Sequence, residues 1–359
     1  MISGGGTGGH IYPAISIAQS LEDMLQEVEI MFVGAQGRME MKKVPEAGYP
    51  IVGLWISGLQ RSLSVQNLLF PVKLVVSVIK AFSLIKSFKP NIVIGVGGYA
   101  SGPLLYAASA KKIPTLIQEQ NSYAGLTNKL LANRVDKICV AHGGMEKYFP
   151  KDKLVVTGNP VRKTIVLPES RKREAFDFFG LDPKKKTILI IGGSLGARSV
   201  NEFILSGYEK LATSGHQVIW QTGGFYFEEM KSRITNPSKD ILARDFVREM
   251  HYAYAVADVV ISRAGALSIA ELMLTGKPSI LVPSPNVAED HQTINAMALV
   301  DREAAILVKD NEGAEKLIDT TLNLLGDEPL KQRLSKNIAA MSHPDSAKDI
   351  ANEILKLIA

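Results

Sequence analysis

Short apolar runs alternate with segments whose apolar residues recur every three or four positions in the first half of the chain. The runs are rich in β-branched residues and predict strands, whereas the longer spacing predicts amphipathic helices. Because parallel strands need a crossover, the alternation predicts βαβ units and a parallel sheet covered on both faces. We expect strands at 28–33, 51–56, 91–96, 114–118, 135–140 and 153–157, and helices at 13–26, 37–44, 67–88, 102–110, 125–133 and 143–148.

The pattern restarts after a linker that begins near Asn159 and a charged helix expected over 170–178. The chain is therefore predicted to be α/β, with two Rossmann-like domains, 1–160 and 161–340, facing across a cleft and a C-terminal helix, about 341–359, packing back on the first. Strands are expected at 187–191, 217–221, 241–243, 258–262, 279–283 and 304–308, and helices at 199–212, 250–257, 266–275, 291–301, 313–325 and 345–358.

The chain begins with a glycine run, residues 4–9, that opens into a helix expected to start near Pro13. Glycines cost backbone entropy and pack nothing, so we expect them to let a ligand approach the backbone. The N-terminus of the following helix favours an anion such as a phosphate. Only Met1-Ile2-Ser3 precede the run, which is short for a strand, so we expect a truncated or misassigned first strand.

Gly4, Gly6 and Gly9 also fit the G-x-G-x-x-G pattern of dinucleotide sites. Such sites carry an acidic residue at the tip of the second strand to hold a ribose. Here that strand ends in Gly34-Ala35-Gln36, without an acid, which disfavours nicotinamide cofactors. A glycine turn that only lets a helix pack close to the sheet remains an alternative.

Composition and charge narrow the class of protein. With 359 residues, 46% of them hydrophobic, and one cysteine, Cys139, the chain suits two domains in a reducing compartment. Neither an export signal nor an apolar run long enough to span a membrane is present. The net charge of +5 does not indicate nucleic acid, but residues 1–160 hold 16 Lys and Arg against 10 Asp and Glu. No acidic residue lies between Glu46 and Glu119, so this stretch should face something negative.

The segment 67–88 allows two interpretations. It is either a buried helix with a lysine stripe, or an interfacial helix whose apolar side chains enter lipid while lysines contact anionic headgroups. The acid-free surroundings favour the second interpretation. The residues expected at an anionic membrane surface are Leu68, Leu69, Phe70, Lys73, Val76 and Lys80.

A second glycine turn, residues 192–197, follows the strand 187–191. It matches the G-x-S-x-G elbow of hydrolases, for which Asp258 and His291 could complete a triad with Ser194. The rival interpretation is a second phosphate loop, which explains why the device occurs twice. The sequence has no Walker loop, Asp-x-Asp pair or His/Cys cluster, so we expect no metal, and a diphosphate neutralised by amides and a cation such as Arg162.

Six motifs spread over nearly the whole chain closely resemble the MurG family of bacterial N-acetylglucosaminyltransferases. They are 5–10, 97–103, 119–121, 158–162, 192–197 and 263–268. The resemblance implies a GT-B fold, UDP-N-acetylglucosamine as donor, undecaprenyl-linked lipid I as acceptor and no cofactor. It also implies inversion at the anomeric carbon and peripheral attachment to the cytoplasmic face of the inner membrane, with cell-wall synthesis proteins as further partners.

Carried over by motif, the resemblance assigns residues to both substrates. Glu271 would hold the ribose and the backbone of Val247 the uracil. The donor site would comprise Thr7, Gly8, Gly9, Asn121, Arg162, Ser194, Val247, Ala266, Leu267, Ser268, Ile269, Ala270, Glu271 and Gln292. The acceptor diphosphate would face Gly4, Gly5, Gly6, Gly97, Gly98, Tyr99 and Ser101.

The reaction needs a base to deprotonate the attacking acceptor hydroxyl. His10 is the first candidate, because the dipole at a helix N-terminus opposes its protonation. Glu119 is the second, and a His10 that only caps the loop is the alternative to a catalytic role. Two other activities remain open at this point: a UDP-N-acetylglucosamine 2-epimerase and a non-catalytic two-domain sensor of small molecules.

Overall fold

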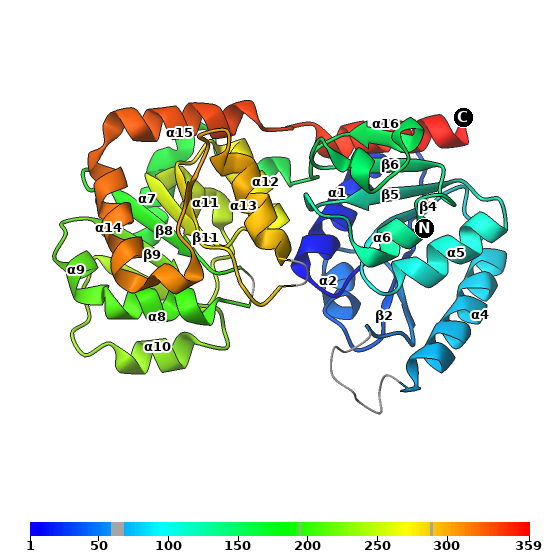
Figure 1. Ribbon diagram of the computed structural model, residues 1–359, viewed down its shortest axis with the longest axis horizontal. Coiled ribbons are helices and arrows are strands. Elements are labelled where there is room, and N and C mark those ends of the chain that lie inside the picture. The colour runs from blue at the N-terminus through cyan, green and yellow to red at the C-terminus, as the bar shows by residue number, and fades with distance from the viewer. Residues whose placement is uncertain (59–67, 194, 288–289) are drawn as a thin grey trace. The chain divides into compact units, whose positions relative to one another are not determined.

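The computed structural model describes residues 1–58, 68–193, 195–287 and 290–359. They form two compact units, unit 1 with Met1–Val161 and Asp345–Ala359, and unit 2 with Arg162–Pro344. Each unit is built on one parallel sheet with helices on its faces (Figure 1). The last helix thus belongs to the unit in which the chain begins.

Unit 1 contains a seven-stranded sheet in the order β3-β2-β1-β4-β5-β6-β7. Its strands are β1 (Ile2–Gly4), β2 (Phe32–Ala35), β3 (Ile51–Leu54), β4 (Val93–Gly97), β5 (Thr115–Glu119), β6 (Lys137–Val140) and β7 (Leu154–Val156). Its helices are α1 (Gly8–Met24), α2 (Glu40–Glu46), α4 (Phe70–Phe88), α5 (Ser101–Ala110), α6 (Leu126–Leu131) and α16 (Ser346–Ile358), with 3-10 turns at Met145–Lys147 and Lys151–Lys153.

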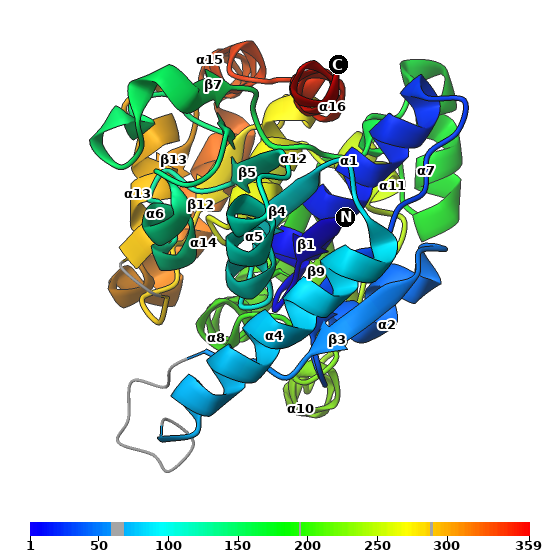
Figure 2. The same cartoon turned by 90° about the vertical axis from the view of Figure 1, so that its right-hand side faces the viewer.

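Alternate strand residues of unit 1 enter cores on opposite faces of the sheet. Phe32 and Ile94 pack with α1, α2 and α16, whereas their neighbours Val33 and Val93 pack with α4, α5 and α6. This is the period-two alternation of a strand buried on both sides. Figure 2 shows α4 beside α5, in agreement with their contacts.

Unit 2 repeats the design with a six-stranded parallel sheet in the order β10-β9-β8-β11-β12-β13. Its strands are β8 (Thr187–Ile191), β9 (Gln217–Gln221), β10 (Ile241–Arg244), β11 (Val259–Ser262), β12 (Ser279–Leu281) and β13 (Ile306–Leu307). Its helices are α7 (Lys172–Phe179), α8 (Arg198–Ser206), α9 (Tyr208–Ala212), α10 (Phe227–Arg233), α11 (Met250–Val256), α12 (Ala266–Thr275), α13 (His291–Val300), α14 (Gly313–Gly326) and α15 (Glu328–Ala340), with 3-10 turns at Lys163–Ile165, Glu169–Arg171 and Asp310–Glu312.

The two sheets share one strand order, so each has its topological switch point beside its first strand. In unit 1 the switch lies between β1 and β4, and in unit 2 it lies between β8 and β11. Connections from the two strands leave in opposite directions there and open a crevice at the carboxyl edge, where ligands bind in folds of this kind. Both glycine loops follow these first strands, which places them at the expected binding edge of each sheet.

The expectation of a misassigned first strand was wrong. Ile2 and Ser3 pair with β2 on one side and with β4 on the other, so β1 is a genuine central strand of three residues. The helix after it starts at Gly8 rather than near Pro13, which lies inside the helix. Glycine and proline have poor helix propensity, which is why the sequence pattern placed the boundary too late.

Most predicted elements are confirmed, with differences at a few places. The helix expected over 199–212 breaks at Gly207, where a Cβ would lie 2.4 Å from Ile318 Cγ1 of α14. The helix expected over 143–148 is a 3-10 turn, and α10 was not expected at all. Asn67, the first residue of the helix expected over 67–88, lies outside the described residues.

Candidate active site

The glycine loop of unit 1 is packed against the loop that follows β4. The N–H of Gly5 donates to the carbonyl of Gly97 at 3.3 Å. Gly98 has φ +91°, and a Cβ there would lie 2.5 Å from the Gly5 carbonyl oxygen. A Cβ on Gly97, at φ +105°, would lie 2.5 Å from Cδ2 of His10. The glycines therefore let the two loops touch and seat the His10 ring over Gly97.

His10 lies in the first turn of α1, and its ring contacts the backbone of the glycine loop. Its Nδ1 is 2.9 Å from the carbonyl oxygen of Gly5 and 3.5 Å from Oγ1 of Thr7. A carbonyl oxygen can only accept, so in the neutral ring Nδ1 donates its proton to Gly5 and the basic lone pair lies on Nε2. The geometry therefore orients one ring nitrogen as a proton acceptor.

Glu119, the alternative base, accepts hydrogen bonds from the segment that follows it in the chain, residues 121–128. One carboxylate oxygen accepts from the N–H and side-chain amide of Asn121 at 3.1 and 3.3 Å. The other accepts from the N–H of Gly125 and the side chain of Asn128, both at 2.8 Å. Glu119 is 2% exposed. Four donors to a buried carboxylate are the arrangement of a residue that shapes a loop, so this geometry favours His10 over Glu119 as the base.

The remaining predicted residues of unit 1 differ in what they can reach. Thr7 is exposed and precedes α1 in extended conformation. Tyr99 is partly exposed, and a Cβ on Gly58 would meet its ring at 2.4 Å. Ser101 is buried and donates to the carbonyls of Gly97 and Ser3. Ser101 therefore ties the two loops together rather than presenting its hydroxyl to a ligand.

In unit 2 the second glycine loop lies equally close to its neighbour. Gly193 and Gly196 have φ of +85° and +80°. A Cβ on Gly196 would lie 2.1 Å from the carbonyl oxygen of Thr222, so the loop touches the segment after β9. Ser194, predicted to bind phosphate, lies outside the described residues.

Arg263 links the carboxyl ends of several elements in unit 2. Its Nη1 donates to the carbonyls of Val282 and Pro283 at 2.9 and 3.0 Å and to Asp310 at 2.6 Å. Its Nη2 donates to Ser199 at 2.6 Å. The sequence motif contained Arg263 without assigning it a role. Its buried bonds fix the loops after β11 and β12 against the start of α8.

The start of α12 forms the next part of this edge. Gly265 precedes the helix in extended conformation, and residues 266–268 form its first turn. Ile269 and Ala270 are buried, and the N–H of Ile269 donates to the carbonyl of Gly265 at 2.9 Å. The predicted contact of these two residues with the donor stays a prediction.

Glu271 lies one turn further along α12 and accepts a hydrogen bond from the buried Tyr254 hydroxyl at 3.0 Å. Burial raises the pKa of Glu271 to about 7, although the bond from Tyr254 and the charge of Arg162 both lower it. Burial likewise raises the pKa of Tyr254. Tyr254 was not predicted, since nothing in its sequence position relates it to Glu271. The pair presents a carboxyl group that titrates near neutral pH.

Val247 and Gln292 contribute backbone and amide groups. The N–H of Val247 donates to Oε1 of Gln221 at 2.9 Å, so pairing with a uracil through this N–H requires Gln221 to release it. Gln292 accepts from the N–H of Ser284 at 2.9 Å, which points its amide NH₂ away from that bond. Of the predicted donor residues, these two belong to unit 2 with Arg162 and 266–271, and Thr7, Gly8, Gly9 and Asn121 belong to unit 1.

The hydrolase interpretation is wrong. Asp258 accepts from the N–H of Thr187 at 2.7 Å, at the amino end of β8. His291 begins α13, after the carboxyl end of β12. In a parallel sheet these are opposite edges, so the two side chains cannot join one triad.

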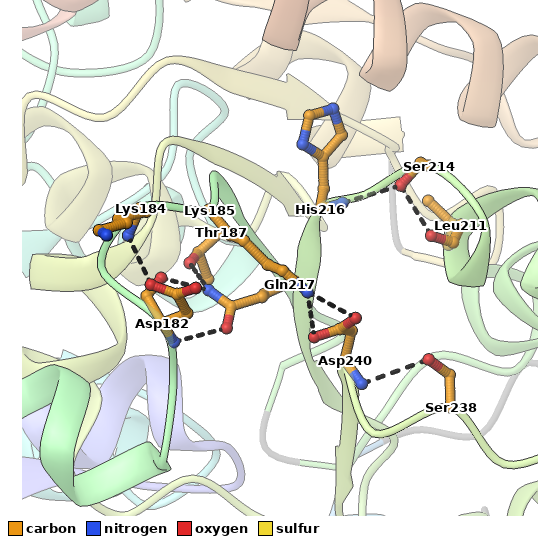
Figure 3. A network of polar contacts seen from close by, with 10 residues as sticks. All are labelled: Asp182, Lys184, Lys185, Thr187, Leu211, Ser214, His216, Gln217, Ser238 and Asp240. Atoms are coloured by element: carbon orange, nitrogen blue, oxygen red, sulfur yellow. Dashed lines mark hydrogen bonds and ion pairs between the residues drawn. The ribbon is translucent and has the colours of Figure 1, made fainter.

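The amino edge of the unit 2 sheet is occupied by structural hydrogen bonds (Figure 3). Gln217 bonds both backbone groups of Asp182, at 2.7 and 2.9 Å. Lys185 bonds Asp240 at 2.8 and 2.9 Å. His216 also lies at this edge, and its backbone N–H donates to Ser214 at 3.3 Å. These bonds hold strand ends together on the side away from the glycine loop.

The outer face of α4 is apolar and exposed. Ile79 and Val75 are 64% and 58% exposed, while only Ser77, Ala81 and Ile85 of this helix are buried. The interpretation as a buried helix is therefore wrong. Along the described chain, no helix combines the length and the apolar character needed to cross a bilayer.

The predicted lysine stripe does not lie on this apolar face. Lys73 donates to Ser57 at 3.1 Å and Lys80 to the carbonyl of Gly53 at 2.9 Å. Both side chains turn back toward the end of β3, so they anchor the helix to its own unit. Leu68 and Leu69 are exposed just before the helix, and Phe70 is partly buried against the core.

Comparison with known proteins identifies the family. Residues 1–140 match the glycosyltransferase family 28 N-terminal domain and residues 187–350 its C-terminal domain. A UDP-N-acetylglucosamine--N-acetylmuramyl-(pentapeptide) pyrophosphoryl-undecaprenol N-acetylglucosamine transferase of Cytophaga hutchinsonii is 54% identical over 358 residues, covering 100% of this chain and 96% of the relative.

Two solved structures extend the comparison. The crystal structure of MurG from Acinetobacter baumannii has a TM-score of 0.78 and 27% identity, covering 99% of this chain and 98% of that one. A UDP-GlcNAc 2-epimerase from Neisseria meningitidis has a TM-score of 0.69 at 15% identity, covering 99% of each chain, and so shares the fold alone. The two Rossmann-like units and the likeness to the MurG structure identify the fold as GT-B. The match to both glycosyltransferase domains identifies the protein as an enzyme. The chain belongs to glycosyltransferase family 28.

Proposed function

We propose that this chain transfers N-acetylglucosamine from UDP-N-acetylglucosamine to the 4-hydroxyl of the N-acetylmuramoyl sugar in undecaprenyl-linked lipid I, giving lipid II for peptidoglycan synthesis. Its high identity to a named transferase of that reaction over the full chain supports the substrates. The observation that carries the chemistry is the 2.9 Å contact of His10 Nδ1 with the Gly5 carbonyl, which leaves Nε2 as the base.

The proposed reaction is a direct displacement at the anomeric carbon. The acceptor oxygen attacks C1 of the donor sugar from the face opposite UDP, and His10 Nε2 takes the hydroxyl proton as the new bond forms. The bond from C1 to the UDP oxygen breaks, and its electron pair leaves with UDP. The donor is an α-linked sugar nucleotide, so the product linkage is β.

Unit 2 is the proposed donor unit. The first turn of α12 offers backbone N–H groups and the positive end of the helix dipole to the diphosphate. Arg162 adds a positive charge that acts on Glu271. Glu271 in its ionised form accepts hydrogen bonds from the ribose hydroxyls, and Gln292 donates its amide to the sugar. Ser194, Ala266, Leu267 and Ser268 complete this proposed site.

Unit 1 is the proposed acceptor unit, with the diphosphate of lipid I beside the loops at 4–9 and 97–101. The exposed apolar face of α4 supports attachment to a membrane surface, because such a face loses unfavourable contact with water when it enters lipid. We place the protein at the cytoplasmic face of the inner membrane, as a peripheral protein, beside other cell-wall synthesis proteins. UDP-sugars and the diphosphate end of lipid I would meet there.

The test is a transfer assay with purified protein, UDP-N-acetylglucosamine and a short-chain lipid I analogue in detergent. We expect a β-linked disaccharide product by mass spectrometry and NMR. An acceptor lacking the 4-hydroxyl is the matched control and should give none. Conversion of the donor to its 2-epimer would instead identify an isomerase, and donor binding without turnover would identify a sensor. Either result would overturn the proposal.

A further inference from the structure

A carboxylate from α2 lies directly beneath the glycine loop of unit 1. Glu40 is 1% exposed. Its Oε2 accepts from the N–H of Gly6 at 2.8 Å, and its Oε1 accepts from the N–H of Ala35 at 3.0 Å. One side chain thus bridges the loop after β1 and the tip of β2.

Two glycines make room for this side chain. A Cβ on Gly5 would lie 2.2 Å from Oε1 of Glu40, and the three nearest atoms it would meet all belong to Glu40. A Cβ on Gly34 would lie 2.5 Å from Cγ of Glu40. Contacts this short require something to shift, so the Glu40 side chain occupies a slot that only glycines on both sides leave open.

The carboxylate also changes what the loop can bind. The N–H of Gly6 is engaged by Glu40, so a substrate diphosphate could use it only by displacing a buried carboxylate. A buried carboxylate that lost these bonds would be strongly destabilised. This argues against the earlier assignment of Gly6 as a direct contact of the acceptor diphosphate. The negatively charged group that binds this part of the loop is instead the buried carboxylate of Glu40.

From these contacts we propose that Glu40 is a positioning residue for His10. Glu40 fixes Gly6, and the adjacent Gly5 provides the carbonyl that receives the His10 Nδ1 proton. A loop released from Glu40 would move that carbonyl, and the imidazole would lose both its orientation and its preferred tautomer. The inference rests on the proposed function for its effect on turnover, but not for its effect on the His10 ring.

The kinetic test compares Glu40→Ala and Glu40→Gln with the parent. We expect Glu40→Ala to lower kcat by about 10- to 100-fold, the usual cost of misplacing a catalytic group through its supporting shell. Glu40→Gln keeps one acceptor oxygen, so its kcat should lie between the kcat of Glu40→Ala and that of the parent. Binding of UDP-N-acetylglucosamine should be unchanged, since the residues proposed to hold its ribose, diphosphate and sugar lie in unit 2. Glu46→Gln, on the exposed end of the same helix, is the matched control and should behave as the parent.

A second pair of variants keeps the test decisive if loss of Glu40 reduces stability. Gly5→Ala should be damaging in the parent, because the new methyl group strikes Glu40. In the Glu40→Ala background the same change should add little. Equal damage from Gly5→Ala in both backgrounds would show that Glu40 does not occupy the slot as described, and would overturn the inference.

The His10 ring can be observed without turnover. In ¹⁵N NMR of the full chain, with the resonance assigned through His10→Gln, the neutral parent ring should be the Nδ1–H tautomer. Glu40→Ala should shift it toward a mixture. Parental kcat and an unchanged tautomer in a folded Glu40→Ala protein would refute the positioning role. A changed tautomer in a protein that transfers no sugar would instead uphold it and count against the proposed function.

Discussion

At the scale of single residues, His10 carries the chemistry proposed here. The Gly5 carbonyl and Gly97 confine its ring, which prepares Nε2 to accept a proton. We expect His10→Ala to lower kcat by about 10²- to 10⁴-fold, the usual contribution of a general base, while UDP binding stays at the parental level. Steady-state kinetics with the lipid I analogue and calorimetry with UDP measure the two quantities.

The control for this variant is His216→Ala. His216 lies at the amino edge of the unit 2 sheet, away from the glycine loop that follows β8 (Figure 3). Burial lowers the pKa of His216, so this histidine favours its neutral form. Turnover should therefore survive its removal. Similar losses of kcat in the two variants would count against a specific role for His10.

Glu271 gives the donor site a predicted pH dependence. Its pKa of about 7 means that near pH 6 most of the free protein carries a neutral carboxyl group there. Ribose hydroxyls favour the ionised form, so binding expels a proton below pH 7, and the affinity should fall by up to about tenfold per pH unit as the pH decreases. Above pH 7 the affinity should level off. Titration calorimetry of UDP-N-acetylglucosamine in buffers of different ionisation enthalpy measures the proton release.

Glu271→Gln removes the titrating group and keeps the shape of the side chain. Its affinity should be weaker at pH 8 and nearly independent of pH between 6 and 8. A parental pH dependence in this variant would assign the titration to another residue and remove Glu271 from the ribose contact.

At the scale of elements, α4 is unusual because it exposes a row of apolar side chains. Its apolar side chains at 72, 75, 76 and 79 face water, although an apolar surface of this kind is usually covered. We expect Val75→Glu/Ile79→Glu to abolish binding to vesicles that contain anionic lipids, measured by co-sedimentation. Transfer to a detergent-dispersed acceptor should persist, because both side chains are exposed and lie outside the core of unit 1.

The matched control is Phe178→Glu on α7, a half-exposed apolar residue of unit 2. It likewise places a glutamate at an exposed apolar position, and it should leave vesicle binding intact. If the α4 double variant still binds vesicles as the parent does, the membrane face of the protein lies elsewhere.

The lysines of α4 illustrate why a helical projection is incomplete. Lys73 and Lys80 share a face of the ideal helix, and the sequence placed them at lipid headgroups. In the structure each reaches back to a group near β3. A flexible four-carbon side chain can swing to either side of its helix, so only the tertiary neighbours decide which partner it finds.

At the scale of the whole molecule, the last helix returns to the unit of the first. Ile350, Ala351 and Ile354 of α16 enter the core that α1 forms with the sheet of unit 1. We expect Ile350→Ala to destabilise unit 1 by about 2–5 kcal/mol through the cavity it leaves. UDP binding by unit 2 should be unaffected. Denaturant-dependent hydrogen exchange, with peptides from each unit, separates the two effects.

Ile358→Ala, at a position 39% exposed on the same helix, is the control and should cost far less. Loss of protection across residues 162–344 in Ile350→Ala would contradict the assignment of α16 to unit 1 alone. The sequence analysis expected a C-terminal helix that packs back on the first domain, and in the structure α16 packs against α1.

The sequence by itself determined the alternation of strands and helices, both glycine loops and the family motifs, because these depend on local periodicity and on the backbone freedom of glycine. It did not reveal Glu40, which comes from α2 and accepts hydrogen bonds from the N–H groups of Ala35 and Gly6. Nor did it reveal the partnership of Tyr254 with Glu271 or the bonds of Arg263.

Tertiary structure decided these points because each joins side chains from elements that are distant in the chain. It also decided which nitrogen of His10 is basic, since the Gly5 carbonyl beneath the ring sets the tautomer. Local sequence fixes where a residue can lie along an element. Hydrogen bonds and burial, which depend on the whole fold, fix its protonation and orientation, and through them its chemistry.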